Sequence, residues 1–78
     1  MEHLLDVREL RCPVPYVRAR ALVSGLAAGD TLVVLATDPE APIDLGALAA
    51  EHGLEFAVAG EEIRLRRPRR RGADRPRP

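Results

Sequence analysis

The stretch TLVVLAT, residues 31–37, decides the fold, because it is the clearest strand in the sequence: continuous, apolar and rich in β-branched residues. The segment TDPEAP, residues 37–42, ends this run with turn-forming residues. A periodic apolar pattern precedes the strand and another follows it. We therefore expect a central strand that is flanked by two helices along the chain.

The segment before the strand, from Pro15 to Leu26, has apolar residues at steps of three and four, which is typical of a helix with one buried face. The residues expected on the buried face are Tyr16, Ala19, Leu22, Val23 and Leu26. Gly29 follows and is expected to end the helix in the left-handed conformation.

The second helix is predicted to run from Asp38 to about His52. Asp38 before Pro39 has the pattern of an N-cap residue followed by proline at the first helical position. Gly53 is expected to end the helix. The residues expected to point inward are Leu45, Leu48 and Ala49.

Three further segments have strand patterns. HLLDV (3–7) predicts a first strand, and LEFAV (54–58) and IRLR (63–66) predict a hairpin around AGEE. The order is βαβαββ, so we expect an α+β fold: a two-layer sandwich of a four-stranded mixed sheet with two helices on one face.

The other face of such a sheet has no helix over it. Because residues 32–36 are all apolar, some of these side chains must point to that face. The sequence leaves two alternatives open: an apolar patch that binds a partner or a second copy, or cover by neighbouring side chains and the C-terminal tail.

The charges are unevenly distributed, although the 78 residues carry 12 Arg and 12 Asp or Glu and have a net charge of zero. Residues 1–63 hold 4 Arg and 11 acidic residues, a net charge of −7, whereas residues 64–78 hold 8 Arg and 1 Asp, a net charge of +7. We predict one domain over residues 1–67 and a disordered Arg/Pro-rich tail over 68–78. Three roles of the tail stay open. It makes the protein more soluble, it binds weakly to phosphate such as that of tRNA or to an acidic partner, or it folds back on the acidic body.

The chain has one cysteine, so no disulfide forms within it, and no Cys/His cluster has the spacing of a zinc site. We therefore expect no metal and no cofactor. A free thiol, no signal-peptide pattern and no apolar run of membrane-spanning length predict a soluble cytoplasmic protein that does not bind membranes.

The cysteine, Cys12, stands in LRCPVP (10–15), where the first helix is expected to begin. Pro13 and Pro15 suit the first turn of a helix because they lack the N–H group and have φ fixed near −65°. The positive end of the helix dipole stabilises an anion, so we predict a moderate lowering of the pKa of Cys12. Arg11 and Arg8 are expected to lower this pKa further.

A lone thiol restricts the chemistry. His3 and His52 are the histidines of the chain, and neither is expected to reach Cys12 as a base. The pattern favours a thiol that carries sulfane sulfur as a persulfide, Cys–S–SH. The alternatives are a buried structural cysteine, a redox sensor that oxidises or forms mixed disulfides, and a non-catalytic RNA- or protein-binding regulatory module.

On LDVRELRCPVP (5–15) and GDTLVVLATDPEAPIDL (29–45), the sequence resembles the TusA/SirA-like family of sulfur carrier proteins, over residues 4–67. The resemblance implies a sulfurtransferase that acts as a stoichiometric persulfide carrier. It implies a cysteine desulfurase or rhodanese-like protein as donor, and tRNA thiolation, molybdenum cofactor assembly or sulfur oxidation as the destination of the sulfur. The residues that match the family motifs are Asp6, Arg8, Leu10, Cys12, Pro13, Pro15, Asp38, Pro39 and Asp44.

Two features qualify the resemblance. The family usually has glycine in the leading segment where this chain has Glu9, which we expect to remove backbone freedom and to place an anion near the thiol. Asp38 and Asp44 are explained by helix capping and by first-turn charge, and we favour that explanation over a direct role in sulfur transfer.

Overall fold

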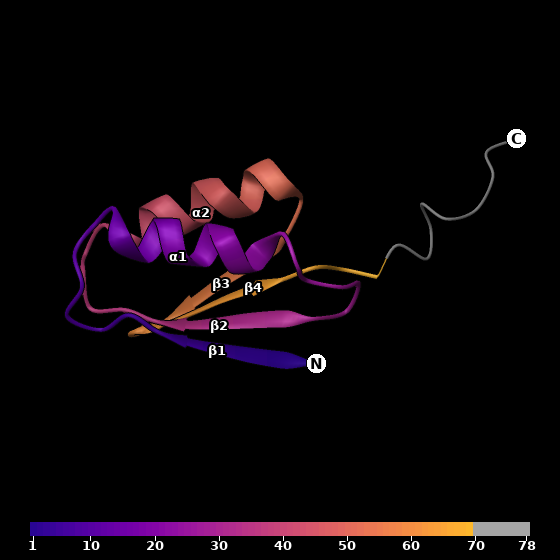
Figure 1. Ribbon diagram of the computed structural model, residues 1–78, viewed down its shortest axis with the longest axis horizontal. Helices are drawn as coiled ribbons and strands as arrows, with labels where there is room; N and C mark the ends of the chain where they lie inside the picture. The colour runs from indigo at the N-terminus through magenta and orange to yellow at the C-terminus, as the bar shows by residue number, and fades with distance from the viewer. Residues whose placement is uncertain (70–78) are drawn as a thin grey trace, which may run out of the picture.

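The computed structural model describes residues 1–69, which contain six regular elements in the order βαβαββ (Figure 1). The elements are β1 (Glu2–Asp6), α1 (Val14–Val23), β2 (Thr31–Leu35), α2 (Ala41–His52), β3 (Glu55–Ala59) and β4 (Glu62–Arg66). The predicted order and the predicted hairpin are confirmed. Of the predicted tail, all but Pro68 and Arg69 lies outside the described residues.

The four strands form one mixed sheet in the order β1-β2-β4-β3. β1 and β2 are parallel because α1 crosses over between them, whereas β4 is antiparallel to β2 and to β3. Both helices lie on one face of the sheet (Figure 1). The two-layer α+β sandwich expected from the sequence is confirmed.

The core fills the space between the sheet and the helices. On β2, Leu32 and Val34 are fully buried, and their partners on β4, Leu65 and Ile63, are buried with them. The helices contribute Ala19, Val23, Leu45, Leu48 and Ala49. The inward residues predicted for α2 are therefore confirmed, because alternate strand residues and one stripe of each helix meet in a single core.

The buried face of α1 differs from the prediction. Leu22 is 44% exposed, and Pro15 is buried in its place. The buried positions of the helix are 15, 19 and 23, a spacing of four residues that leaves Leu22 beside the stripe. Tyr16 packs against the core while only partly buried.

The prediction that Gly29 ends α1 is wrong. The helix ends at Val23, with Ser24 as its C-cap in the right-handed conformation. Gly29 has a φ of 89° in the turn before β2, and its N–H donates to the carbonyl of Arg67 at 2.6 Å. The left-handed glycine therefore serves the entry into β2.

α2 begins later than predicted. Its N-cap is Glu40 instead of Asp38, and the proline in its first turn is Pro42 instead of Pro39. Asp38 stabilises the preceding turn, because its Oδ1 accepts a hydrogen bond from the N–H of Glu40 at 2.9 Å. Gly53 ends the helix with a φ of 66°, as predicted.

The helix-free face of the sheet is covered by ion pairs between its own strands. Val33 points to this face but is only 6% exposed. Arg64 lies opposite Val33 on β4 and reaches Glu2 on β1 at 3.1 Å, so its side chain has to cross β2. The stem of an arginine covers apolar surface in this way. This arrangement favours cover by neighbouring side chains, with Leu4 left exposed.

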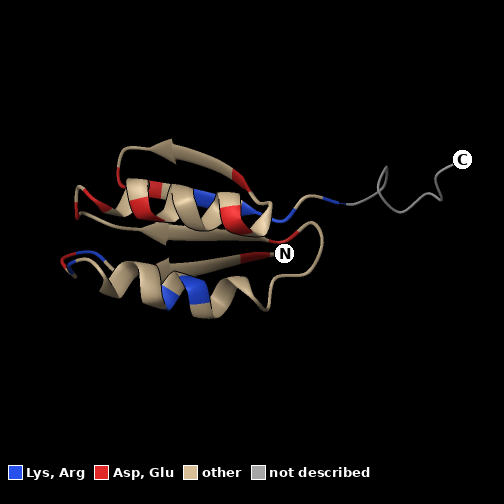
Figure 2. Ribbon diagram, turned by 90° about the horizontal axis from the view of Figure 1, so that it is seen from above, with Lys and Arg blue, Asp and Glu red and all other residues tan. Residues whose placement is uncertain are grey.

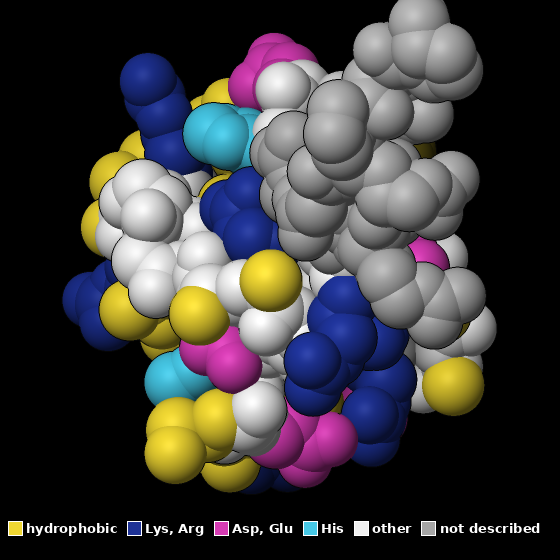
Figure 3. All heavy atoms as spheres, turned by 90° about the vertical axis from the view of Figure 1, so that its right-hand side faces the viewer, with side chains coloured by type: hydrophobic (Ala, Val, Ile, Leu, Met, Phe, Trp, Pro, Cys, Tyr) yellow, Lys and Arg dark blue, Asp and Glu magenta, His cyan; other side chains and the backbone are white. Residues whose placement is uncertain are grey.

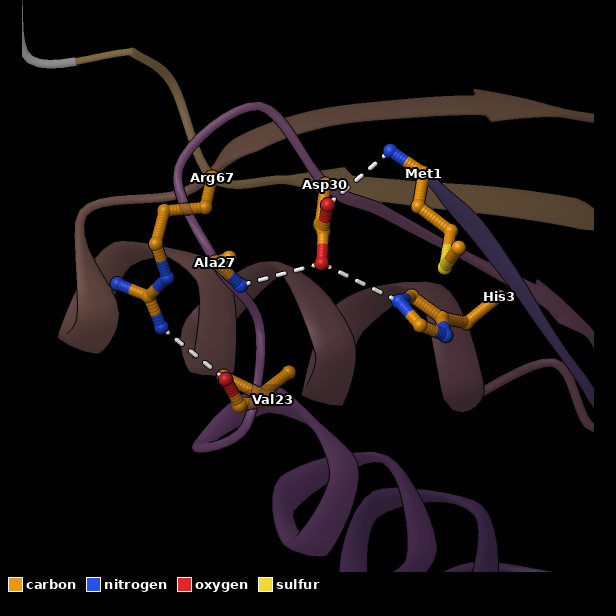
Figure 4. A network of polar contacts seen from close by, with 6 residues as sticks. All are labelled: Met1, His3, Val23, Ala27, Asp30 and Arg67. Carbon is orange, nitrogen blue, oxygen red and sulfur yellow. Dashed lines mark hydrogen bonds and ion pairs between the residues drawn. The ribbon is translucent and has the colours of Figure 1, made fainter.

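Asp30 organises the end of the molecule at which the N-terminus lies. Its carboxylate contacts the ammonium of Met1 at 3.1 Å, Nε2 of His3 at 3.2 Å and the N–H of Ala27 at 3.2 Å (Figure 4). These contacts, the ammonium first, lower the pKa of Asp30 to about 2. Figure 3 views this end, where acidic, basic and histidine side chains lie side by side.

Candidate functional site

Cys12 lies in the loop between β1 and α1, at the opposite end of the molecule from the N-terminus (Figure 1). Its side chain is an exposed free thiol, which excludes the buried structural cysteine. The residue stands one position before Pro13, the N-cap of α1, so the predicted location at the helix start is confirmed.

The two prolines shape the helix start but also remove hydrogen-bond donors near the sulfur. Pro13 is the N-cap and Pro15 lies in the first turn, and neither has an N–H group. The N–H of Val14 between them donates to the carbonyl of Arg11 at 2.8 Å. The N–H groups at positions 13 and 15 are therefore missing, and that of Val14 is already used.

Two carboxylates bind Cys12 instead. The backbone N–H donates to Oδ2 of Asp38 at 2.6 Å, and the thiol donates to Oδ2 of Asp44 at 2.6 Å. Asp38 lies in the loop after β2, and Asp44 lies in the first turn of α2, as predicted. The explanation of Asp44 as a favourable charge in the first turn of α2 is therefore incomplete, because its carboxylate also accepts a hydrogen bond from the thiol.

The pKa of the Cys12 thiol is raised to about 11, which contradicts the predicted lowering. The hydrogen bond to Asp44 is the main cause, because it stabilises the protonated thiol; desolvation and the negative charges of Asp44, Glu40 and Asp38 act in the same direction. The dipole of α1, which stabilises an anion only within its first turn, is thus opposed by a hydrogen bond and three carboxylates that favour the neutral thiol.

Of the two arginines expected to stabilise the thiolate, Arg8 is paired with another residue. Arg8 donates two side-chain hydrogen bonds to Asp6, at 2.7 and 3.0 Å. This pair lowers the pKa of Asp6 and raises that of Arg8. Arg11 stays near the site, where its charge helps to lower the pKa of Asp38 behind the larger effect of the backbone N–H groups of Glu40 and Cys12. The predicted action of Arg8 on the thiol is wrong.

The site is a depression of about 740 Å³ between two loops. The loop before α1 contributes Glu9, Leu10, Arg11 and Cys12, and the loop before α2 contributes Thr37, Asp38, Pro39 and Glu40. Figure 2 shows the acidic residues in these loops, at the end where both helices begin. The structure thus brings together the two motifs that the sequence separates by more than 20 residues.

Cys12, Glu40 and Asp44 also form a group in residues 1–69 whose ligand atoms lie within 4.8 Å of one another. We do not assign a metal to this group, because exposed acidic groups are common without an ion. Glu40 was missed by the sequence analysis, since its approach to the sulfur depends on how the two loops pack.

Comparison with known proteins gives the family of the chain. The family model described as sulfurtransferase TusA matches residues 3–66, which contain both motifs. The chain belongs to the TusA family. It is 38% identical over 58 residues to the sulfur carrier protein TusA of Allochromatium vinosum, covering 74% of this chain and 76% of that protein. It is 41% identical over 58 residues to a protein of Neisseria meningitidis serogroup A named as a candidate sulfur carrier, covering 74% and 78%.

Membership of the TusA family makes Glu9 informative, because the resemblance implies a glycine there. Glu9 has a φ of 70°, which a residue with a side chain rarely adopts. Its N–H donates to Oγ1 of Thr37 at 2.8 Å, which joins the two loops. The backbone therefore keeps the left-handed conformation, and the prediction that Glu9 removes it is wrong. Thr37 is a further residue that the sequence analysis missed.

The remaining features of this TusA-family chain lie apart from the thiol. His3 contacts Asp30, and His52 is the last residue of α2, whose first turn carries Asp44.

Within residues 1–69, no helix has both the length and the apolar character needed to cross a membrane.

Proposed function

We propose that Cys12 accepts sulfane sulfur as a persulfide and passes it to an acceptor protein. The observation that carries this proposal is the position of the chain's one thiol, exposed beside a depression built from both family motifs. Membership of the TusA family supports sulfur transfer between donor and acceptor proteins, and the persulfide on Cys12 is our assignment.

The chemistry needs one thiol and no cofactor. The sulfur of Cys12 attacks the outer sulfur of a donor persulfide, R–S–SH; the new S–S bond forms as the donor bond breaks, and the donor leaves as R–SH after it takes up one proton. Cys12–S–SH then delivers the outer sulfur to an acceptor thiol in the same way. Each cycle returns the free thiol, so the protein acts as a stoichiometric carrier.

The donor is a cysteine desulfurase or a rhodanese-like protein, and the acceptor serves tRNA thiolation, molybdenum cofactor assembly or sulfur metabolism. A cytoplasmic location follows from these partners and from the free thiol. Residues 1–67 form the carrier domain in this proposal, and the Arg-rich segment 68–78 supplies a weak electrostatic contact with tRNA or an acidic partner.

The raised pKa of Cys12 bears on the redox-sensor alternative. Peroxide reacts with the thiolate, and a pKa of about 11 leaves roughly one thiol in ten thousand ionised at pH 7. The small thiolate fraction slows the reaction with peroxide and with a dissolved persulfide alike. Sulfur transfer therefore needs a donor that is held against Cys12, as a partner protein would hold it.

The test is the intact mass of the protein after incubation with a cysteine desulfurase and cysteine. We expect the mass of one sulfur atom to be added, to be removed again by dithiothreitol, and to be absent in Cys12→Ser. A wild-type mass that stays unchanged with desulfurase and rhodanese-type donors alike would contradict the proposal.

A further inference from the structure

Asp44 is, among the described residues, the side chain that hydrogen-bonds the sulfur of Cys12. We propose that Asp44 is a catalytic residue whose carboxylate takes the thiol proton while the sulfur of Cys12 attacks a donor persulfide. This inference rests on the proposed function and adds to it the group that activates the nucleophile.

The proton path needs only Cys12, Asp44, the donor persulfide and water. The S–H bond of Cys12 breaks as its sulfur bonds to the outer sulfur of R–S–SH, and the proton moves along the existing 2.6 Å contact to Oδ2 of Asp44. The donor leaves as R–S⁻ and takes a proton from water or from Asp44. The products are Cys12–S–SH and R–SH, and no oxidant or reductant is consumed.

The neighbouring acidic residues are less suited to this role. Both oxygens of Asp38 accept backbone hydrogen bonds, from the N–H groups of Cys12 and Glu40. Glu40 acts on the thiol through its charge, without a hydrogen bond to the sulfur. The charged groups around the thiol are Glu9 and Arg11 from its own loop, Asp38 and Glu40 from the loop before α2, and Asp44 from α2.

The acidic surroundings also make a preformed thiolate a poor alternative. With a pKa of about 11, the ionised fraction of Cys12 is small at neutral pH and rises tenfold with each pH unit. A carboxylate base removes this dependence, because it takes the proton during the attack and no thiolate has to form beforehand. The two routes therefore differ in the pH dependence of the transfer rate.

The experiment follows sulfur transfer from glutathione persulfide to the full chain by intact mass, between about pH 6 and pH 9. Asp44→Asn and the wild type are compared at each pH, so that changes in the donor cancel in the ratio of their rates. We expect the ratio of wild type to Asp44→Asn to fall about tenfold per pH unit until the thiol of the variant itself ionises, because only the wild type has the base. Glu40→Gln is the matched control, since it removes one negative charge but no hydrogen bond to the sulfur. Its ratio to the wild type should stay constant with pH.

A ratio of wild type to Asp44→Asn that does not change with pH would overturn the inference. If Asp44→Asn does not fold, the pH profile of the wild type decides, measured relative to a small thiol of known pKa with the same donor: a wild-type rate that rises about tenfold with each pH unit indicates a preformed thiolate and overturns the inference. A wild type that takes up no sulfur at any pH contradicts the proposed function itself. Uptake by the wild type with a constant ratio contradicts only the role of Asp44.

Discussion

The backbone N–H of Cys12 donates to Oδ2 of Asp38 at 2.6 Å, so this hydrogen bond connects the loop that carries the thiol with the loop before α2. The second oxygen of Asp38 accepts the N–H of Glu40 within that loop. One carboxylate therefore joins the two walls of the depression. Both backbone hydrogen bonds lower the pKa of Asp38, which keeps it an acceptor at neutral pH.

Replacing Asp38 should loosen this junction. We expect Asp38→Ala to lower the melting temperature by several degrees, because two backbone N–H groups lose their acceptor. Asp38→Asn keeps one carbonyl oxygen and should fall between Asp38→Ala and the wild type. Differential scanning calorimetry measures the order, with Glu51→Gln, an exposed residue of α2, as the control for loss of charge. Equal melting temperatures for wild type and Asp38→Ala would show that the junction does not stabilise the fold.

The features that the sequence predicts correctly are those that local patterns determine. The inward residues Leu45 and Leu48 follow the period of one helix, and Gly53 marks its end. The start of α2 was misplaced because Asp38 and Glu40 both precede a proline-containing turn, and only the packing of the two loops decides which one caps the helix.

The raised pKa of Cys12 could not be predicted from the sequence. The contact between Cys12 and Asp44 joins residues 32 positions apart, and it reverses the sign of the pKa shift that the helix start alone predicts. The pairing of Arg8 with Asp6, two residues away, is a local pattern that could have been recognised. The prediction that Arg8 lowers the pKa of Cys12 overlooks this pairing, in which the charge of Arg8 is already balanced by Asp6.

The core gives a prediction with an internal control. Leu48 is fully buried, so Leu48→Ala should lower the free energy of unfolding by about 2–5 kcal/mol, through lost burial and the cavity that remains. Leu22→Ala makes the same chemical change on α1 at a side chain that is 44% exposed, and it should cost less than about 1 kcal/mol. Urea unfolding measures both. Similar losses for the two variants would place Leu22 in the core and contradict the observed face of α1.

Asp30 predicts how stability changes in acid. Its pKa is lowered to about 2 from 3.8, so its contribution to stability is complete above about pH 4 and is lost as the pH falls through about 2. Asp30→Asn should lower the melting temperature at pH 7 and flatten the change between about pH 4 and pH 2. Thermal unfolding followed by circular dichroism at a series of pH values tests this. Parallel curves for wild type and variant across that range would rule out Asp30 as the source of the acid sensitivity.

Glu9 predicts an order of stability among substitutions at one position. With a φ of 70°, a residue that has a Cβ atom costs roughly 1 kcal/mol relative to glycine, and a β-branched residue costs more. The free energy of unfolding should therefore be highest for Glu9→Gly, nearly equal for Glu9→Ala and the wild type, and lowest for Glu9→Val. All four proteins keep the backbone N–H that donates to Thr37, so the loop contact itself is unchanged and serves as the common reference. Chemical denaturation gives the order directly. A Glu9→Gly variant less stable than the wild type would mean that the glutamate side chain stabilises the loop by more than its backbone conformation costs.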